Sequence, residues 1–101
     1  MSLYTVYVTP SAWREIKDLP GHMRQQIKRA IDALADDPHP SASKTIALPE
    51  ELTYEVRRLR LDKWRVVYAV TEGDKAVDVL TVRKRPPYDY SDLEKLLADM
   101  A

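Results

Sequence analysis

The sequence predicts an α+β domain: a small, mainly antiparallel sheet with an N-terminal helical hairpin packed on one face and a short C-terminal helix. Three observations lead to this prediction. A run rich in β-forming residues opens the chain at Leu3–Val8, two stretches of helical periodicity follow, and three apolar strands fill the second half. We therefore expect the order β-α-α-β-β-β within one domain that spans residues 1–101.

The composition is that of a soluble globular protein, with 45% hydrophobic and 32% charged residues. No segment approaches the roughly 20 apolar residues that a membrane-spanning helix needs, and no signal-peptide pattern opens the chain. Cysteine is absent from the sequence, which excludes disulfides and thiolate metal sites and makes the cytoplasm the expected location.

The first helix is predicted to begin at Thr9-Pro10, with Thr9 as N-cap and Pro10 at the first helical position. Trp13, Ile16 and Leu19 supply its apolar stripe, and Pro20-Gly21 ends it.

A second helix is predicted from about Met23 to Leu34 or Ala35. Five apolar residues recur there at helical spacing: Met23, Ile27, Ala30, Ile31 and Leu34. Asp37-Pro38-His39-Pro40 stops it, because proline cannot continue a helix. The two helices form a hairpin.

The second half of the chain predicts strands at about Tyr54–Leu61, Trp64–Thr71 and Ala76–Val82. Turns are expected at Asp62-Lys63 and Glu72-Gly73-Asp74. Before these strands, Ser41–Leu52 is expected to be an irregular connection with a short strand near Thr45–Leu48. After them, Ser91 and Glu94 have capping-box spacing and predict a short helix.

The net charge is zero, but the positive charge is concentrated in one segment. Between Tyr54 and Tyr88 nine Lys and Arg stand against five Asp and Glu, so that segment carries +4. Alternation along Trp64–Thr71 places Arg65, Val67 and Ala69 on one face. The opposite face is more apolar and should face the core, so we expect Arg65, and Arg57 on the preceding strand, to project from an open sheet face.

Most familiar catalytic patterns are absent from the sequence. Its two glycines form no phosphate-binding loop, and His22 and His39 have no metal-ligand spacing, so we expect no metal and no cofactor. What remains is a group of cations and tyrosines around Val82–Tyr90. Arginine binds phosphate oxygens through a two-pronged cation, which suits RNA as a ligand.

RNA can be cleaved without a metal when its 2′-hydroxyl attacks the adjacent phosphate. This reaction needs a base, cations for the phosphoryl charge and a proton donor for the leaving 5′-oxygen. Arg65, Lys84 and Arg85 fit the cationic roles, while Tyr88 or Tyr90 could stack on a base or exchange a proton. Substrate contacts are expected from three further arginines: Arg57, Arg60 and Arg83. From the residues alone, the prediction is a phosphate-binding domain.

The sequence resembles the RelE/ParE toxin superfamily of bacterial toxin–antitoxin systems. The resemblance covers nearly the whole chain and is most specific in the strand Trp64–Tyr68 and the segment Val82–Tyr88. It implies the fold described above. For RelE-like members it implies cleavage of mRNA in the ribosomal A site, a 2′,3′-cyclic phosphate product, and inhibition by a cognate antitoxin.

By position in this family, Arg65 matches the strand arginine that contacts the scissile phosphate. Arg85, with Lys84 beside it, matches the basic group at the end of the last strand, and Tyr88 best matches the C-terminal tyrosine, although Tyr90 is close. Two cationic positions are expected on the preceding strand. Arg57 falls near one of them, but Glu55 occupies the other, which is a departure from the family.

Two other functions stay open. ParE-like relatives share the fold but act on DNA gyrase, and a noncatalytic member would bind only an antitoxin or RNA. The neutral net charge gives weight to the noncatalytic alternative. The basic and tyrosine positions that match the family favour the ribonuclease.

Overall fold

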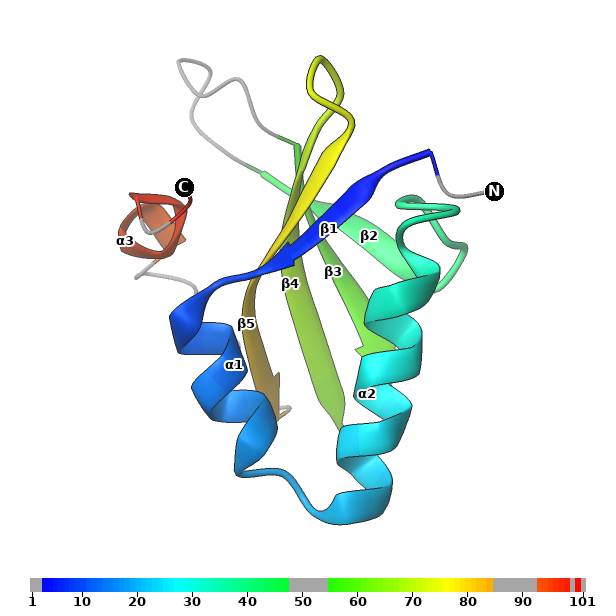
Figure 1. Cartoon of the computed structure of the whole chain (residues 1–101), viewed down its shortest axis with the longest axis vertical. Helices are drawn as coiled ribbons and strands as arrows, with labels where there is room; N and C mark the ends of the chain where they lie inside the picture. Colours follow the sequence, from blue (N-terminus) through cyan, green and yellow to red (C-terminus); the bar gives the residue numbers. More distant parts are fainter. Residues whose placement is uncertain (1–2, 48–54, 85–92, 99, 101) are drawn as a thin grey trace.

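The structure is a computed structural model that describes residues 3–47, 55–84, 93–98 and 100. Its elements follow one another as β1 (Thr5–Val8), α1 (Pro10–Lys17), α2 (Gly21–Ala33), β2 (Ser43–Ile46), β3 (Glu55–Leu61), β4 (Trp64–Thr71), β5 (Ala76–Lys84) and α3 (Leu93–Ala98). Figure 1 shows α1 and α2 as a hairpin whose two helices run roughly along the direction of β3, β4 and β5.

The five strands form one sheet in the order β1-β5-β4-β3-β2. The pairs β2–β3, β3–β4 and β4–β5 are antiparallel, whereas β1 pairs with β5 in parallel. The α+β class is therefore confirmed, and the sheet is mixed. The first strand joins the last because the helical hairpin and three strands lie between them in sequence, and such a long connection permits parallel pairing.

The element boundaries differ modestly from the sequence prediction. The second helix begins at Gly21, before the predicted Met23, and β5 continues to Lys84. The weakly predicted short strand is real, but it lies at Ser43–Ile46, two residues earlier than expected. The turn at Asp62-Lys63 is confirmed, with Asp62 at a φ of 55°, a conformation that aspartate tolerates. The predicted N-cap Ser91 lies outside the described residues.

Helix α1 starts as predicted, and one of its three predicted core residues faces outward. The side chain of Thr9 accepts a hydrogen bond from the Ala12 amide at 3.3 Å, and Pro10 occupies the first turn. Ala12, Ile16 and Leu19 are buried, whereas Trp13 is 45% exposed, so the expectation that Trp13 faces the core is wrong. The small Ala12 side chain takes the buried position one residue earlier, where a tryptophan would hold the helix away from the sheet.

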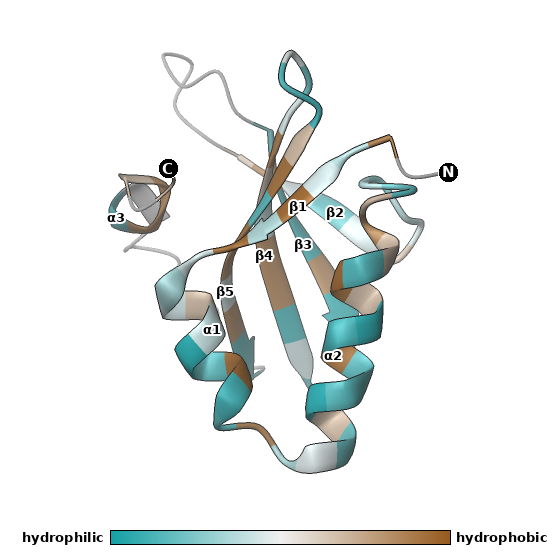
Figure 2. Cartoon of the chain, viewed as in Figure 1, coloured by the Kyte–Doolittle hydropathy of each residue, from teal (hydrophilic) through white to brown (hydrophobic). Residues whose placement is uncertain are grey.

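The main core lies between the helical hairpin and the sheet. Ile16, Ile27 and Leu34 pack there with Val66 and Tyr68. The outer surfaces of both helices are hydrophilic, while the middle of β4 and β5 is hydrophobic (Figure 2). Burial raises the pKa of Tyr68, so its hydroxyl stays protonated and donates to the Pro38 carbonyl at 2.7 Å.

The second face of the sheet carries its own apolar cluster under α3. Leu96 and Leu97 pack there against Val56, Val67 and Leu80. The expectation of an open face is therefore corrected: α3 covers this apolar part, because these side chains would otherwise meet water. No described helix has both the length and the apolar character needed to cross a bilayer.

Asp78 is the one buried acid of this sheet among the described residues. It lies on β5, is 8% exposed, and pairs with Ala69 and Tyr7 on the neighbouring strands. Its carboxyl group makes no hydrogen bond or ion pair within the described part of the chain. Burial raises its pKa, because the charged form loses hydration.

We expect Asp78→Asn to increase the free energy of unfolding at pH 7. The raised pKa in the folded state means that protonation favours folding, and this contribution is lost as the pH rises through the folded-state pKa. The increase in the free energy of unfolding that asparagine gives should therefore shrink as the pH falls below the folded-state pKa of Asp78. Urea denaturation of both proteins from pH 4 to pH 7 measures it, and an advantage that does not change with pH would contradict this account of the Asp78 carboxyl.

Candidate phosphate-binding site

Three arginines lie side by side across three neighbouring strands. Arg60 of β3 pairs with Arg65 of β4, and Arg65 pairs with Arg83 of β5. Side chains of directly paired residues point to the same face, with Cβ atoms about 5 Å apart. We call these three residues the cation row. Cations at this spacing concentrate positive charge where a polyanion could bind.

Arg65, at the centre of the row, is held through its guanidinium group by the adjoining turn. It is 5% exposed, so the expectation that Arg65 projects from an open sheet face is wrong. Its Nη1 donates to the carbonyls of Trp64 at 2.9 Å and Asp62 at 3.1 Å. These bonds orient the guanidinium from one side. A buried arginine fixed in this way is a preorganised cation, because little conformational freedom remains to be lost on binding.

The flanking members of the row are more accessible. Arg60 is exposed, and Arg83 is partly buried with its Nε donating to the hydroxyl of Thr81 at 3.2 Å. The next cross-strand pair on the same face adds Arg58 and Lys44. The row lies at the β3–β4 turn end of the sheet face whose apolar part α3 covers.

Two predicted site residues lie on the opposite face. Arg57 pairs with Tyr68 and Lys84 pairs with Trp64, and both partners belong to the helical-hairpin side of the sheet. The expectation that Arg57 shares the face of Arg65 is therefore wrong. The sequence indication for this placement is Leu59, two residues further along β3. Leu59 lies on the same face of the strand as Arg57, and its apolar side chain is buried in the core.

Arg57 instead belongs to a polar cluster between β2, β3 and the loop after α2. Its guanidinium donates to the hydroxyls of Ser43 at 3.0 Å and Thr45 at 3.1 Å, and lies 3.6 Å from Glu55. His39 Nε2 lies 2.7 Å from the other oxygen of Glu55. Glu55, the departure from the family pattern, thus binds Arg57 and His39 within this cluster. The cations of β3 that share the face of Arg65 are Arg58 and Arg60.

Sequence reasoning missed Arg58, because it assigned the wrong set of β3 residues to the outer face. It missed Lys44, because the short strand was expected to begin only at Thr45. Three other predicted site residues, Arg85, Tyr88 and Tyr90, lie outside the described residues. Among the described residues, no three His, Asp or Glu side chains are grouped so that they could hold a metal ion.

The family model described as the ParE toxin of the type II toxin–antitoxin system parDE matches residues 6–86. The chain belongs to the RelE/ParE toxin superfamily. It is the toxin of a type II toxin–antitoxin system. No curated protein sequence matches this toxin.

Solved structures of RelE proteins share the fold of this toxin. RelE in the archaeal RelE–RelB complex from Pyrococcus horikoshii superposes with a TM-score of 0.73 at 22% identity, covering 83% of this chain and 97% of that one. Isolated RelE from E. coli gives a TM-score of 0.67 at 24% identity, with 93% and 98% covered. The intact E. coli RelBE toxin–antitoxin complex gives 0.64 at 25% identity, with 83% and 99% covered.

Proposed function

We propose that this toxin is a ribosome-dependent, metal-independent endoribonuclease that cleaves mRNA in the ribosomal A site. The observation that carries the proposal is the cation row, in which Arg60, Arg65 and Arg83 converge from three strands. Three arginines at directly paired positions suit a phosphate whose negative charge grows during the reaction.

In the proposed reaction the 2′-hydroxyl oxygen of one nucleotide attacks the adjacent phosphorus, and the bond from phosphorus to the 5′-oxygen breaks. The products are a 2′,3′-cyclic phosphate and a free 5′-hydroxyl. A base takes the proton of the 2′-hydroxyl, and an acid protonates the leaving oxygen. We assign the phosphoryl contacts to Arg65, with Arg60 and Arg83 binding the flanking RNA.

Two further groups are proposed from the family resemblance. Lys84 and Arg85 at the end of the last strand supply cations for the phosphoryl charge, and Tyr88 or Tyr90 beyond it stacks on a base or exchanges a proton. Lys84 is exposed at the last position of β5, next to the end of the cation row. We assign Lys84 to the phosphate because of this place at the strand end, although its pairing with Trp64 lies on the helical face.

The partners proposed for this toxin are a cognate antitoxin and mRNA on the ribosome, which places its action in the cytoplasm. The P. horikoshii and E. coli relatives are in complexes with RelB, and this favours an antitoxin partner here. A second candidate function is inhibition of DNA gyrase. It is favoured by the matching family model, whose description names the ParE toxin.

Primer extension on a defined mRNA in a reconstituted translation reaction tests the proposal. We expect new stops within codons only when both the toxin and ribosomes are present. A gyrase supercoiling assay with the same preparation tests the alternative. Loss of supercoiling without any new stop, at toxin levels well above the ribosomes, would replace the ribonuclease by the gyrase inhibitor, and activity in neither assay would leave a noncatalytic binding protein.

A further inference from the structure

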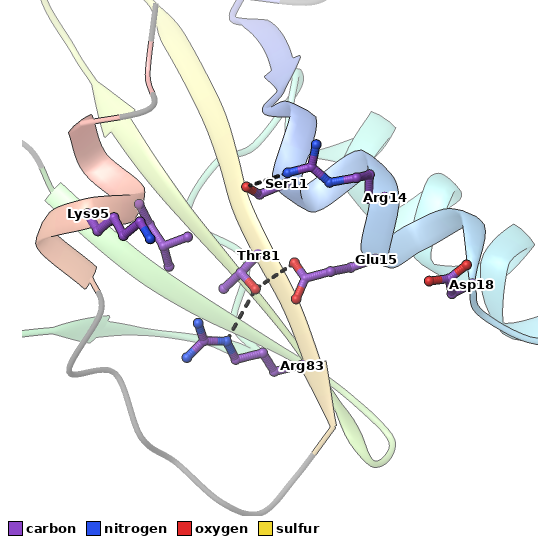
Figure 3. Close-up of a pocket in the computed structure, with 8 residues that line it drawn as sticks. Ser11, Arg14, Glu15, Asp18, Thr81, Arg83 and Lys95 are labelled. Atoms are coloured by element: carbon purple, nitrogen blue, oxygen red, sulfur yellow. Dashed lines mark hydrogen bonds between the residues drawn. The ribbon is translucent and has the colours of Figure 1, made fainter.

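A pocket of about 350 Å³ lies between α1, the end of β5 and α3. Figure 3 shows it with the residues that line it. We call it the edge pocket. Its volume falls within the range of small-ligand sites in proteins.

The edge pocket exists because β1 is shorter than β5. β1 pairs with Ala76–Val79, so no described strand covers the same edge of β5 from Leu80 onward. The side chain of Glu15 on α1 binds this edge of β5 instead. Its Oε1 accepts a hydrogen bond from the Thr81 hydroxyl at 2.7 Å and from the Val82 amide at 3.3 Å. The carboxylate thus satisfies an edge amide that another chain could otherwise pair with.

The same hydrogen bonds connect the pocket to the cation row. The Thr81 hydroxyl, which donates to Glu15, accepts from Arg83 Nε at 3.2 Å (Figure 3). Arg83 therefore belongs to the row and also lines the pocket. A ligand in the edge pocket would therefore lie next to an anion bound by the cation row.

The lining of the pocket combines charges of both signs. Arg14 from α1, Arg83 from β5 and Lys95 from α3 supply cations from three separate elements. Arg14 and Lys95 are exposed, and Arg14 Nη2 donates a long bond of 3.4 Å to the hydroxyl of Ser11. Cations favour a phosphate, the two acids Glu15 and Asp18 can accept hydrogen bonds from sugar hydroxyls, and Leu96 adds an apolar wall.

We propose that the edge pocket binds one nucleotide of a single-stranded RNA whose neighbouring phosphate lies on the cation row. This inference rests on the proposed function and adds a specific subsite to it. Arg14 and Lys95 contact the phosphate or sugar of that nucleotide, and the Glu15–Thr81 pair positions Arg83 between the two sites. The subsite contributes to binding and not to the chemical step.

The test compares Arg14→Ala and Lys95→Ala with Arg29→Ala, an exposed arginine of α2 that lines neither site. Binding of a fluorescein-labelled RNA hexanucleotide is measured by anisotropy without ribosomes, over a range of salt concentrations. Each pocket variant should weaken binding by roughly three- to tenfold. The salt slope should fall by about 0.7 for each phosphate contact removed, and the α2 control should bind like the wild type.

Cleavage on ribosomes separates the two proposals. If the wild type cleaves mRNA, Arg14→Ala should raise KM and leave kcat unchanged, because binding lost equally from ground and transition states alters only KM. Pocket variants that match the α2 control in both binding and KM would overturn the subsite while the ribonuclease stands. A wild type that neither binds the hexanucleotide nor cleaves mRNA would overturn both.

Discussion

Arg65→Ala is expected to lower the rate of mRNA cleavage on ribosomes by at least about tenfold, the usual cost of one lost transition-state contact. The reason is its place at the centre of the cation row, paired with Arg60 on one side and Arg83 on the other. Single-turnover primer extension with excess toxin measures the chemical step directly.

Because Arg65 is 5% exposed and donates to two backbone carbonyls, its loss could also weaken the fold. Arg65→Lys serves as the second variant, since it keeps one positive charge but removes the two-pronged contact. It should remain slower than the wild type, while Arg29→Ala keeps the full rate. Wild-type cleavage by both Arg65 variants, with melting temperatures unchanged, would remove Arg65 from the active site.

Ile27→Ala is expected to lower the free energy of unfolding by about 2–5 kcal/mol. Ile27 is fully buried in the core between the helical hairpin and the sheet, and truncation leaves a cavity that the surrounding side chains cannot close. Urea denaturation followed by circular dichroism measures the change.

Lys28→Ala is the matched control for this substitution. Lys28 is the next residue of α2 and is exposed, so the change should stay within about 0.5 kcal/mol. If the two variants were equally stable, α2 would not be packed on the sheet in the way described.

The helical hairpin was predictable from sequence because its signals are local. The spacing of Ile27, Ile31 and Leu34 and the cap at Thr9 need no distant residue, and all three isoleucine and leucine side chains are buried. Trp13 shows the limit of such reasoning. Helical spacing allows either Ala12 or Trp13 to share a face with Ile16. The close packing of α1 on the sheet buries the small alanine and leaves the tryptophan exposed.

The candidate site was predictable only in part. The sequence singled out Arg65 and Arg83 as functional cations, and the strand register brings them together. It misplaced Arg57, because alternation says which residues of a strand share a face and not which face is covered. The covering helices lie far away in sequence, so Val56 could be buried under α3 while Arg57 joined the polar cluster near Glu55.

The sequence by itself determined the α+β class, the strands and helices, and the arginines available for binding phosphate. These depend on short-range periodicity and residue chemistry. The tertiary structure alone decided that Arg60, Arg65 and Arg83 form one row, that β1 pairs in parallel with β5, and that Glu15 closes the open edge beside a pocket. Pairing register and the packing of distant elements set these contacts, and neither is encoded in the spacing of neighbouring residues.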